Sequence, residues 1–198
     1  MLDGTVTFRL GTFNFGISQD MLGQNAFQKR HKKNLSRVVQ RAIDEGELDM
    51  CAGCEVGSYK LGLGAACINI EDVLAPILPK NAQAQTVQNY LAMWGIAAVS
   101  QRCVPSLSLH TEPIVVQLSS DALEPQLVIS IFEVTLGDLA GFALLGQLHV
   151  RTPSNKSTPS IATRQRMVRE AMRHMESTQR DYACNPGALV LVGDPNLT

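Results

Sequence analysis

The sequence predicts an α/β fold, and three features of the chain support this. A strand, a helix and a second strand follow one another within the first 55 residues. A long amphipathic helix follows at about residues 159–180, and a short buried strand comes directly after it. Alternating and apolar segments between these two units predict further strands. Strands mixed with helices in this way are typical of a sheet covered by helices.

Length and composition point to one soluble domain covering residues 1–198. The chain is 45% hydrophobic and 18% charged, with a net charge of −1, so it is no globally basic nucleic-acid binder. It has no apolar run that could form a signal peptide, and no apolar run approaches the ~20 residues of a membrane span. The five cysteines are scattered, which favours free thiols. We expect an intracellular protein, in cytoplasm or nucleus, that does not engage a membrane.

The first unit begins with an alternating strand at Val6–Phe15, which has Asn14 near its carboxyl end. Apolar residues at helical spacing predict a helix over Asn25–Glu45, with a basic opposite face. A second strand over Asp49–Glu55 places Glu55 at its end. Strand, helix and strand in this order predict a crossover within one sheet.

The middle of the chain is predicted to be mainly strands. A short helix over Ile70–Leu78 precedes them. The strands are expected at about Ile96–Gln101, Glu112–Ser119, Gln126–Val134 and Ala143–Val150, the last of which ends near His149.

The long helix is predicted from about Pro159 to Arg180, with Thr158 as its cap. Its buried stripe is expected to be Met167, Val168, Ala171, Met172 and Met175, whereas Arg164, Arg166, Arg169 and Arg173 lie mainly on other faces. The buried strand Ala188–Val192 then leads to Asp194 and Asn196.

Polar residues share one placement, at the carboxyl ends of predicted strands, where sites of α/β sheets form. They are Asn14, Glu55, His149, Asp194 and Asn196. Such a set can hold a hard divalent cation through oxygen and act on a phosphate ester. Each residue alone has a plainer interpretation: a turn for Asp194 and Asn196, a solvated strand end for Glu55, and a structural histidine for His149.

Four ordered motifs resemble those of the endonuclease/exonuclease/phosphatase superfamily, the deoxyribonuclease I-like phosphoesterases. They are Thr12-Phe13-Asn14, Cys54-Glu55-Val56, Gln147-Leu148-His149 and Val192-Gly193-Asp194-Pro195-Asn196. The resemblance implies a four-layer α/β/β/α sandwich. It also implies that Glu55 binds Mg²⁺, or Mn²⁺ in its place, with Asn14 in the metal shell. His149 would contact the scissile phosphate or assist protonation of the leaving group, Asp194 would orient and deprotonate the attacking water, and Asn196 would hydrogen-bond a phosphate oxygen.

The sequence departs from the family pattern in two ways. Pro195 stands where the family usually has an aromatic residue, and the family's final Asp-His motif is not found before Thr198. We therefore expect a sandwich that is incomplete at its carboxyl end. The expected function is Mg²⁺-dependent phosphoester hydrolysis with a nucleic acid as the leading substrate, although relatives also cleave inositol phosphates and sphingomyelin. The alternative is a degenerate or truncated domain that only binds a partner or nucleic acid.

Overall fold

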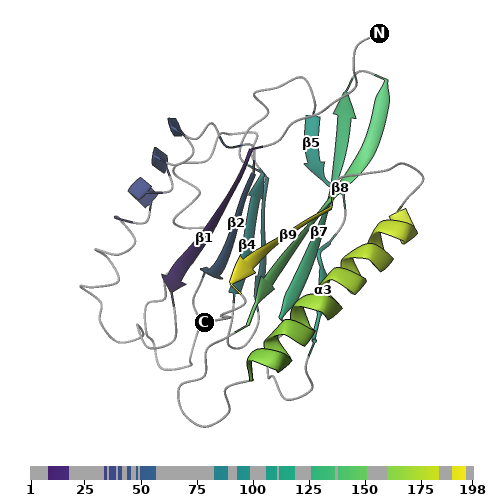
Figure 1. Cartoon of the computed structure of the whole chain (residues 1–198). Coiled ribbons are helices and arrows are strands. Elements are labelled where there is room, and N and C mark those ends of the chain that lie inside the picture. Colours follow the sequence, from purple (N-terminus) through teal and green to yellow (C-terminus); the bar gives the residue numbers. More distant parts are fainter. Residues whose placement is uncertain are drawn as a thin grey trace.

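The computed structural model contains two β-sheets that face each other, with a long helix on the outer face of one of them (Figure 1). It describes residues 9–17, 34, 36–38, 40–41, 44–45, 48, 50–56, 83–88, 93–98, 106–110, 112–118, 126–136, 138–150, 160–182 and 189–194. Helical residues between 34 and 45 lie on the far side of the first sheet (Figure 1). The order helix, sheet, sheet, helix confirms the predicted four-layer arrangement. Among the described residues, no helix has the length and apolar character to cross a membrane.

The first sheet has the strand order β1-β2-β4-β3. Strands β1 (Leu10–Ile17) and β2 (Met50–Val56) are parallel, and the helical residues lie between them in the chain. Parallel neighbours need a crossover connection, so this pairing confirms the predicted strand–helix–strand unit. Strand β4 (Met93–Ala98) runs antiparallel to β2 and to β3 (Gln83–Gln88).

The second sheet has the order β5-β7-β8-β9, and β6 also pairs with β7. Its centre is a hairpin of β7 (Leu127–Leu136) and β8 (Leu139–His149), paired from Leu136↔Leu139 along its length. Strands β5 (Ser106–Leu109) and β6 (Ile114–Val116) flank it. Strand β9 (Leu189–Asp194) runs parallel to β8 after the intervening helix.

Helix α3 (Ile161–Tyr182) covers the outer face of the second sheet. Its stripe of Met167, Ala171 and Met175 is buried, as predicted. The cap differs from the prediction: the Ser160 hydroxyl, rather than Thr158, accepts a hydrogen bond from the backbone N–H of Thr163 at 3.2 Å. Ser160 lies directly before the first helical residue, so its hydroxyl can reach the amides that have no partner within the helix.

Two hydrophobic clusters pack on opposite faces of the second sheet, because neighbouring strand residues point to opposite sides. The outer cluster joins the sheet to α3 and includes Ile129, Leu148 and Met175. The inner cluster joins the two sheets and is formed by Phe132, Ala143 and Leu145 of the second sheet with Ala52 of the first. Strands β7 and β8 are therefore buried on both faces over residues 127–132 and 143–149.

Several segments differ from the sequence prediction. Strands β3 and β5 were not predicted, β4 begins and ends earlier than Ile96–Gln101, and β6 covers only three residues of Glu112–Ser119. The predicted helix Ile70–Leu78 lies outside the described residues.

Candidate active site

Four strand ends meet at one end of the sandwich. Strands β1, β2, β8 and β9 all point the same way, so their carboxyl ends lie together at the lower end in Figure 1. Strand β9 also contacts both β1 and β2 across the interface between the sheets. Each of the four carries one of the predicted site residues at or near its end.

Strand register brings these residues into two adjacent pairs along the backbone. Asp194 is the direct neighbour of His149 across β8 and β9. Asn14 is the neighbour of Cys54, so it lies one residue from the level of Glu55. The structure describes the backbones of Asn14, Glu55 and Asp194 but not their side chains, and Asn196 lies outside the described residues.

His149 is held at the end of β8 and is only 4% exposed. Its backbone N–H donates a hydrogen bond of 2.9 Å to the carbonyl of Gln126, just before β7 begins. The Gln126 side chain in turn accepts a hydrogen bond of 2.7 Å from the backbone N–H of Leu118. These contacts hold the strand end in place, so the backbone of His149 is positioned by the sheet and not by a free loop.

Gln147 is a site neighbour that the sequence analysis did not single out as functional. It lies two residues before His149 and therefore on the same face of β8, and it is 2% exposed. Its only sequence signal is its place in the Gln147-Leu148-His149 motif. Burial of a polar amide between two sheets is a tertiary property, which is why the motif alone did not reveal it.

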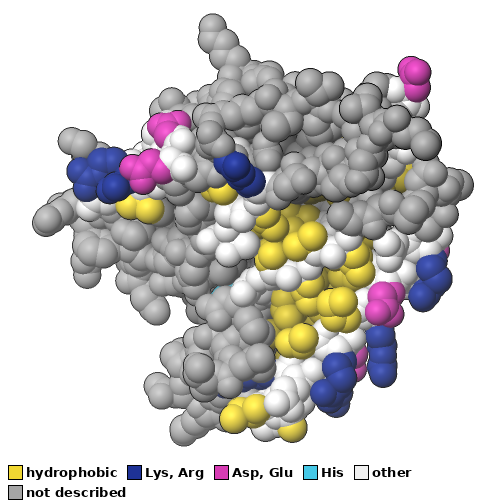
Figure 2. Space-filling model, turned by 45° about the horizontal axis from the view of Figure 1, so that its top comes forward, with side chains coloured by type: hydrophobic (Ala, Val, Ile, Leu, Met, Phe, Trp, Pro, Cys, Tyr) yellow, Lys and Arg dark blue, Asp and Glu magenta, His cyan; other side chains and the backbone are white. Residues whose placement is uncertain are grey.

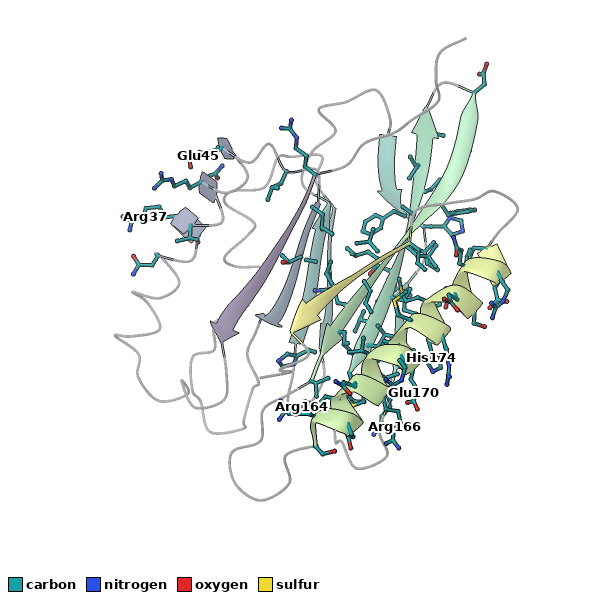
Figure 3. The ribbon with its side chains drawn as sticks, in the orientation of Figure 1. Arg37, Glu45, Arg164, Arg166, Glu170 and His174 are labelled. Atoms are coloured by element: carbon teal, nitrogen blue, oxygen red, sulfur yellow. The ribbon has the colours of Figure 1, made fainter. Side chains whose placement is uncertain are left out.

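Arg164 corrects the prediction that it lies mainly on an outer face of the helix, because it is only 5% exposed. It continues the buried stripe of Met167, Ala171 and Met175 by one further turn. Figure 3 shows Arg164 on the sheet-facing side of α3, whereas Arg166, Glu170 and His174 project from other sides. The sequence contains a signal for this burial: Arg164 lies three residues before Met167, which is the spacing of residues on one helical face.

Arg164 lies beside the strand ends because α3 runs antiparallel to β8. The rings of Phe142, early in β8, and Tyr182, at the end of α3, are 5.9 Å apart. Further along, Met175 packs against Gly146. The helix from Met175 back to Arg164 spans ~16 Å, which matches about five residues of strand beyond Gly146. The first turns of α3 therefore lie level with the end of β8.

The predicted metal ligands, Asn14 and Glu55, fit a hard cation by the chemistry of their donors. Both offer oxygen, the donor that Mg²⁺ prefers, and they belong to neighbouring parallel strands. The part of the chain that the structure describes contains no group of three His, Cys, Asp or Glu side chains able to hold a metal ion. The Glu55 carboxylate does not belong to the described part of the chain.

Charges on the described surface are mixed. In the helical residues between 34 and 45, Arg41 and Glu45 form an ion pair of 2.7 Å. The Gln40 side-chain amide donates a hydrogen bond of 2.9 Å to the Asp44 carboxylate. Arg166 and Glu170 pair at 3.8 Å on α3. On the face of the molecule drawn in Figure 2, basic side chains lie beside acidic ones. Neither described helical region thus presents basic side chains alone.

Comparison with known proteins identifies the fold. No family model and no curated protein matches the sequence. Among solved structures, the chain is similar to a mannosyl-6-phosphatase of Bacteroides thetaiotaomicron, with a TM-score of 0.62, 13% identity, and coverage of 96% of this chain and 66% of the other. An endonuclease/exonuclease/phosphatase family protein of the same organism gives a TM-score of 0.59 and 13% identity, covering 93% of this chain and 60% of the other.

A third similar structure is D. rerio TDP2 complexed with a single-strand DNA product. It has a TM-score of 0.56 and 12% identity, covering 96% of this chain and 60% of the other. The chain therefore has the fold of the endonuclease/exonuclease/phosphatase proteins, as the four motifs predicted. It spans about 60–66% of the length of these three structures, which agrees with an incomplete form of the fold.

Proposed function

We propose that this chain carries the active site of a Mg²⁺-dependent phosphoester hydrolase that acts on nucleic acid. The observation that supports the proposal most strongly is the meeting of four strand ends, with His149 and Asp194 as direct neighbours. A likeness in fold to proteins named as a phosphatase and as TDP2 with a DNA product supports the class of reaction and the leading substrate.

Each polar residue at these strand ends has its own proposed role in phosphoester hydrolysis. Asp194 accepts a proton from the attacking water, and Asn196 donates a hydrogen bond to a phosphate oxygen. His149 contacts the scissile phosphate or protonates the leaving oxygen, a role for which a residue held at a strand end is well suited. Asn14 and Glu55 would hold Mg²⁺, with Mn²⁺ as a substitute, and the ion when bound supplies positive charge to the phosphoryl group.

The test measures turnover of the purified chain on single-stranded DNA and, separately, on a phosphorylated sugar. We expect cleavage of DNA that requires Mg²⁺ and stops with a chelator. Glu55→Ala and His149→Ala should each lower turnover by about 10²–10⁴-fold, the range for loss of a catalytic group. His174→Ala is the matched control, because His174 is exposed on α3, away from the strand ends.

Three outcomes would decide against parts of this proposal. Turnover that survives both Glu55→Ala and His149→Ala would show that the activity does not come from this site. Cleavage of the phosphorylated sugar alone would keep the site and replace the substrate. No turnover on either substrate, by a chain with a cooperative unfolding transition, would favour a non-catalytic domain that binds a partner or nucleic acid.

A further inference from the structure

Three polar side chains lie buried between the two sheets and form what we call the inner polar row: Ser130, Gln147 and His149. Ser130 belongs to β7, and the other two belong to β8. They are 1%, 2% and 4% exposed, respectively. The row leads from the interior of the sandwich to the strand end where His149 lies.

The described neighbours of the interior part of this row, Ser130 and Gln147, are apolar. The same face of the sheet carries Phe132, Ala143 and Leu145, which pack against Ala52 of the first sheet. The Ser130 hydroxyl is buried and has no hydrogen-bond partner among the described residues. A buried polar group without a partner costs about 1–3 kcal/mol. Side chains of this kind in an interface between sheets call for an explanation beyond packing.

Strand register places Gln147 in the middle of the row. Gln147 pairs with Val128 and Leu145 pairs with Ser130, so Gln147 and Ser130 are diagonal neighbours on one face. Diagonal neighbours in a sheet are ~7–8 Å apart between Cα atoms, within reach of a long side chain. His149 is two residues further along the same strand, at ~7 Å. A glutamine amide carries both an acceptor and two donors, so it can serve the hydroxyl and the imidazole together.

We propose that Gln147 is a positioning residue, whose amide fixes the orientation and tautomer of the His149 imidazole, with the Ser130 hydroxyl behind it. Gln147 Oε1 and His149 Nε2 are both buried atoms that do not bond each other directly, so the link between them runs through one ordered water. The proposal rests on the function proposed for His149. A histidine that contacts a phosphate must present one chosen ring nitrogen, and a hydrogen bond to the other nitrogen makes that choice.

The first measurement reads the His149 tautomer directly. Long-range ¹H–¹⁵N spectra of the ¹⁵N-labelled chain resolve the two ring nitrogens, and the His149→Ala spectrum assigns the signals. We expect one dominant neutral tautomer in the unchanged chain and a mixture in Gln147→Met, which has similar size but no amide. Val128→Ala is the matched control, because Val128 lies opposite Gln147 and its loss disturbs packing without removing a polar group. It should leave the tautomer unchanged.

The second measurement separates positioning from stability. Gln147→Met should lower kcat by about 10–100-fold, as loss of an orienting partner does at comparable sites, with KM nearly unchanged. In the His149→Ala background the same substitution should have no further effect on kcat.

An unchanged tautomer in Gln147→Met, or an equal loss of kcat in the His149→Ala background, would overturn the inference. If the unchanged chain shows no turnover, the proposed function fails, whereas the spectra still decide what Gln147 does.

Discussion

Gly193 determines how β9 ends beside His149. Its φ is 141°, a conformation that side chains other than glycine rarely adopt. A Cβ atom built at this position would overlap the backbone of Leu148 in the neighbouring strand. The close approach of β8 and β9, and with it the pairing of His149 and Asp194, therefore depends on the absence of a side chain.

We predict that Gly193→Ala destabilises the chain by at least ~1–3 kcal/mol, from backbone strain alone, and that it displaces Asp194. The measurement is the free energy of unfolding in urea. Gly141→Ala is the control, because a Cβ at Gly141 meets no atom within 4 Å. Equal stability of the two variants would show that β9 can end in another way.

At the scale of single residues, the sequence identified strand-end positions but not buried polar ones. Asp194 could be placed because an apolar run shows where its strand lies, and His149 for the same reason. Gln147 and Arg164 could not be placed, because polar side chains in a periodic pattern normally mark a solvated position. Their burial comes from the first sheet and from the packing of α3, which are distant in sequence.

At the scale of single elements, the cap of α3 can be tested directly. The Ser160 hydroxyl accepts the Thr163 N–H, and its carbonyl accepts the Arg164 N–H at 3.0 Å. Ser160→Ala should cost about 0.5–2 kcal/mol, as loss of a serine cap does. The backbone bond to Arg164 should remain, so the helix should persist in the circular dichroism spectrum.

The control for this prediction is Ser177→Ala, an exposed site inside the same helix. Because alanine has the higher helix propensity, this variant should be slightly more stable than the unchanged chain. A larger loss of stability in Ser177→Ala than in Ser160→Ala would contradict the assigned cap.

Elements with long, regular patterns were predicted well, whereas the edge strands β3 and β5 were not predicted. Helix α3, β7 and β8 are long and bury a clear apolar face, so periodicity revealed them. Strand β3, Gln83–Gln88, is rich in glutamine and lies at the edge of its sheet. An edge strand needs no continuous apolar face, and its pairing with β4 is decided by tertiary contacts that a local pattern does not carry.

At the scale of the whole molecule, the second sheet lies between α3 and the first sheet and packs against both. Its outer face holds α3, and its inner face holds the first sheet through the inner cluster. The proposed site needs the contact between the sheets, since Asn14 and Glu55 come from one sheet and His149 and Asp194 from the other. The four motifs predicted this arrangement through their resemblance to a known fold, whereas periodicity alone predicted only a sheet with helices.

The packing between the sheets can be weakened by one substitution, Phe132→Ala. Phe132 is fully buried and is the largest side chain of the inner cluster. Its removal should cost about 3–5 kcal/mol, a large part of the ~5–15 kcal/mol stability of a typical domain. Because this cluster joins the sheets, the variant should also lose hydrolytic turnover while α3 keeps its contact with the other face.

The measurements are urea unfolding and hydrogen exchange of β2 and α3, and the control is Phe142→Ala. Phe142 is half-buried and belongs to an aromatic group with His110 and Tyr182, near the start of β8. Its loss should cost less and should leave turnover intact, because it lies far from the strand ends. If Phe142→Ala reduced turnover as much as Phe132→Ala, the alignment of the strand ends would depend on the outer layer, and the role assigned to the inner cluster would be wrong.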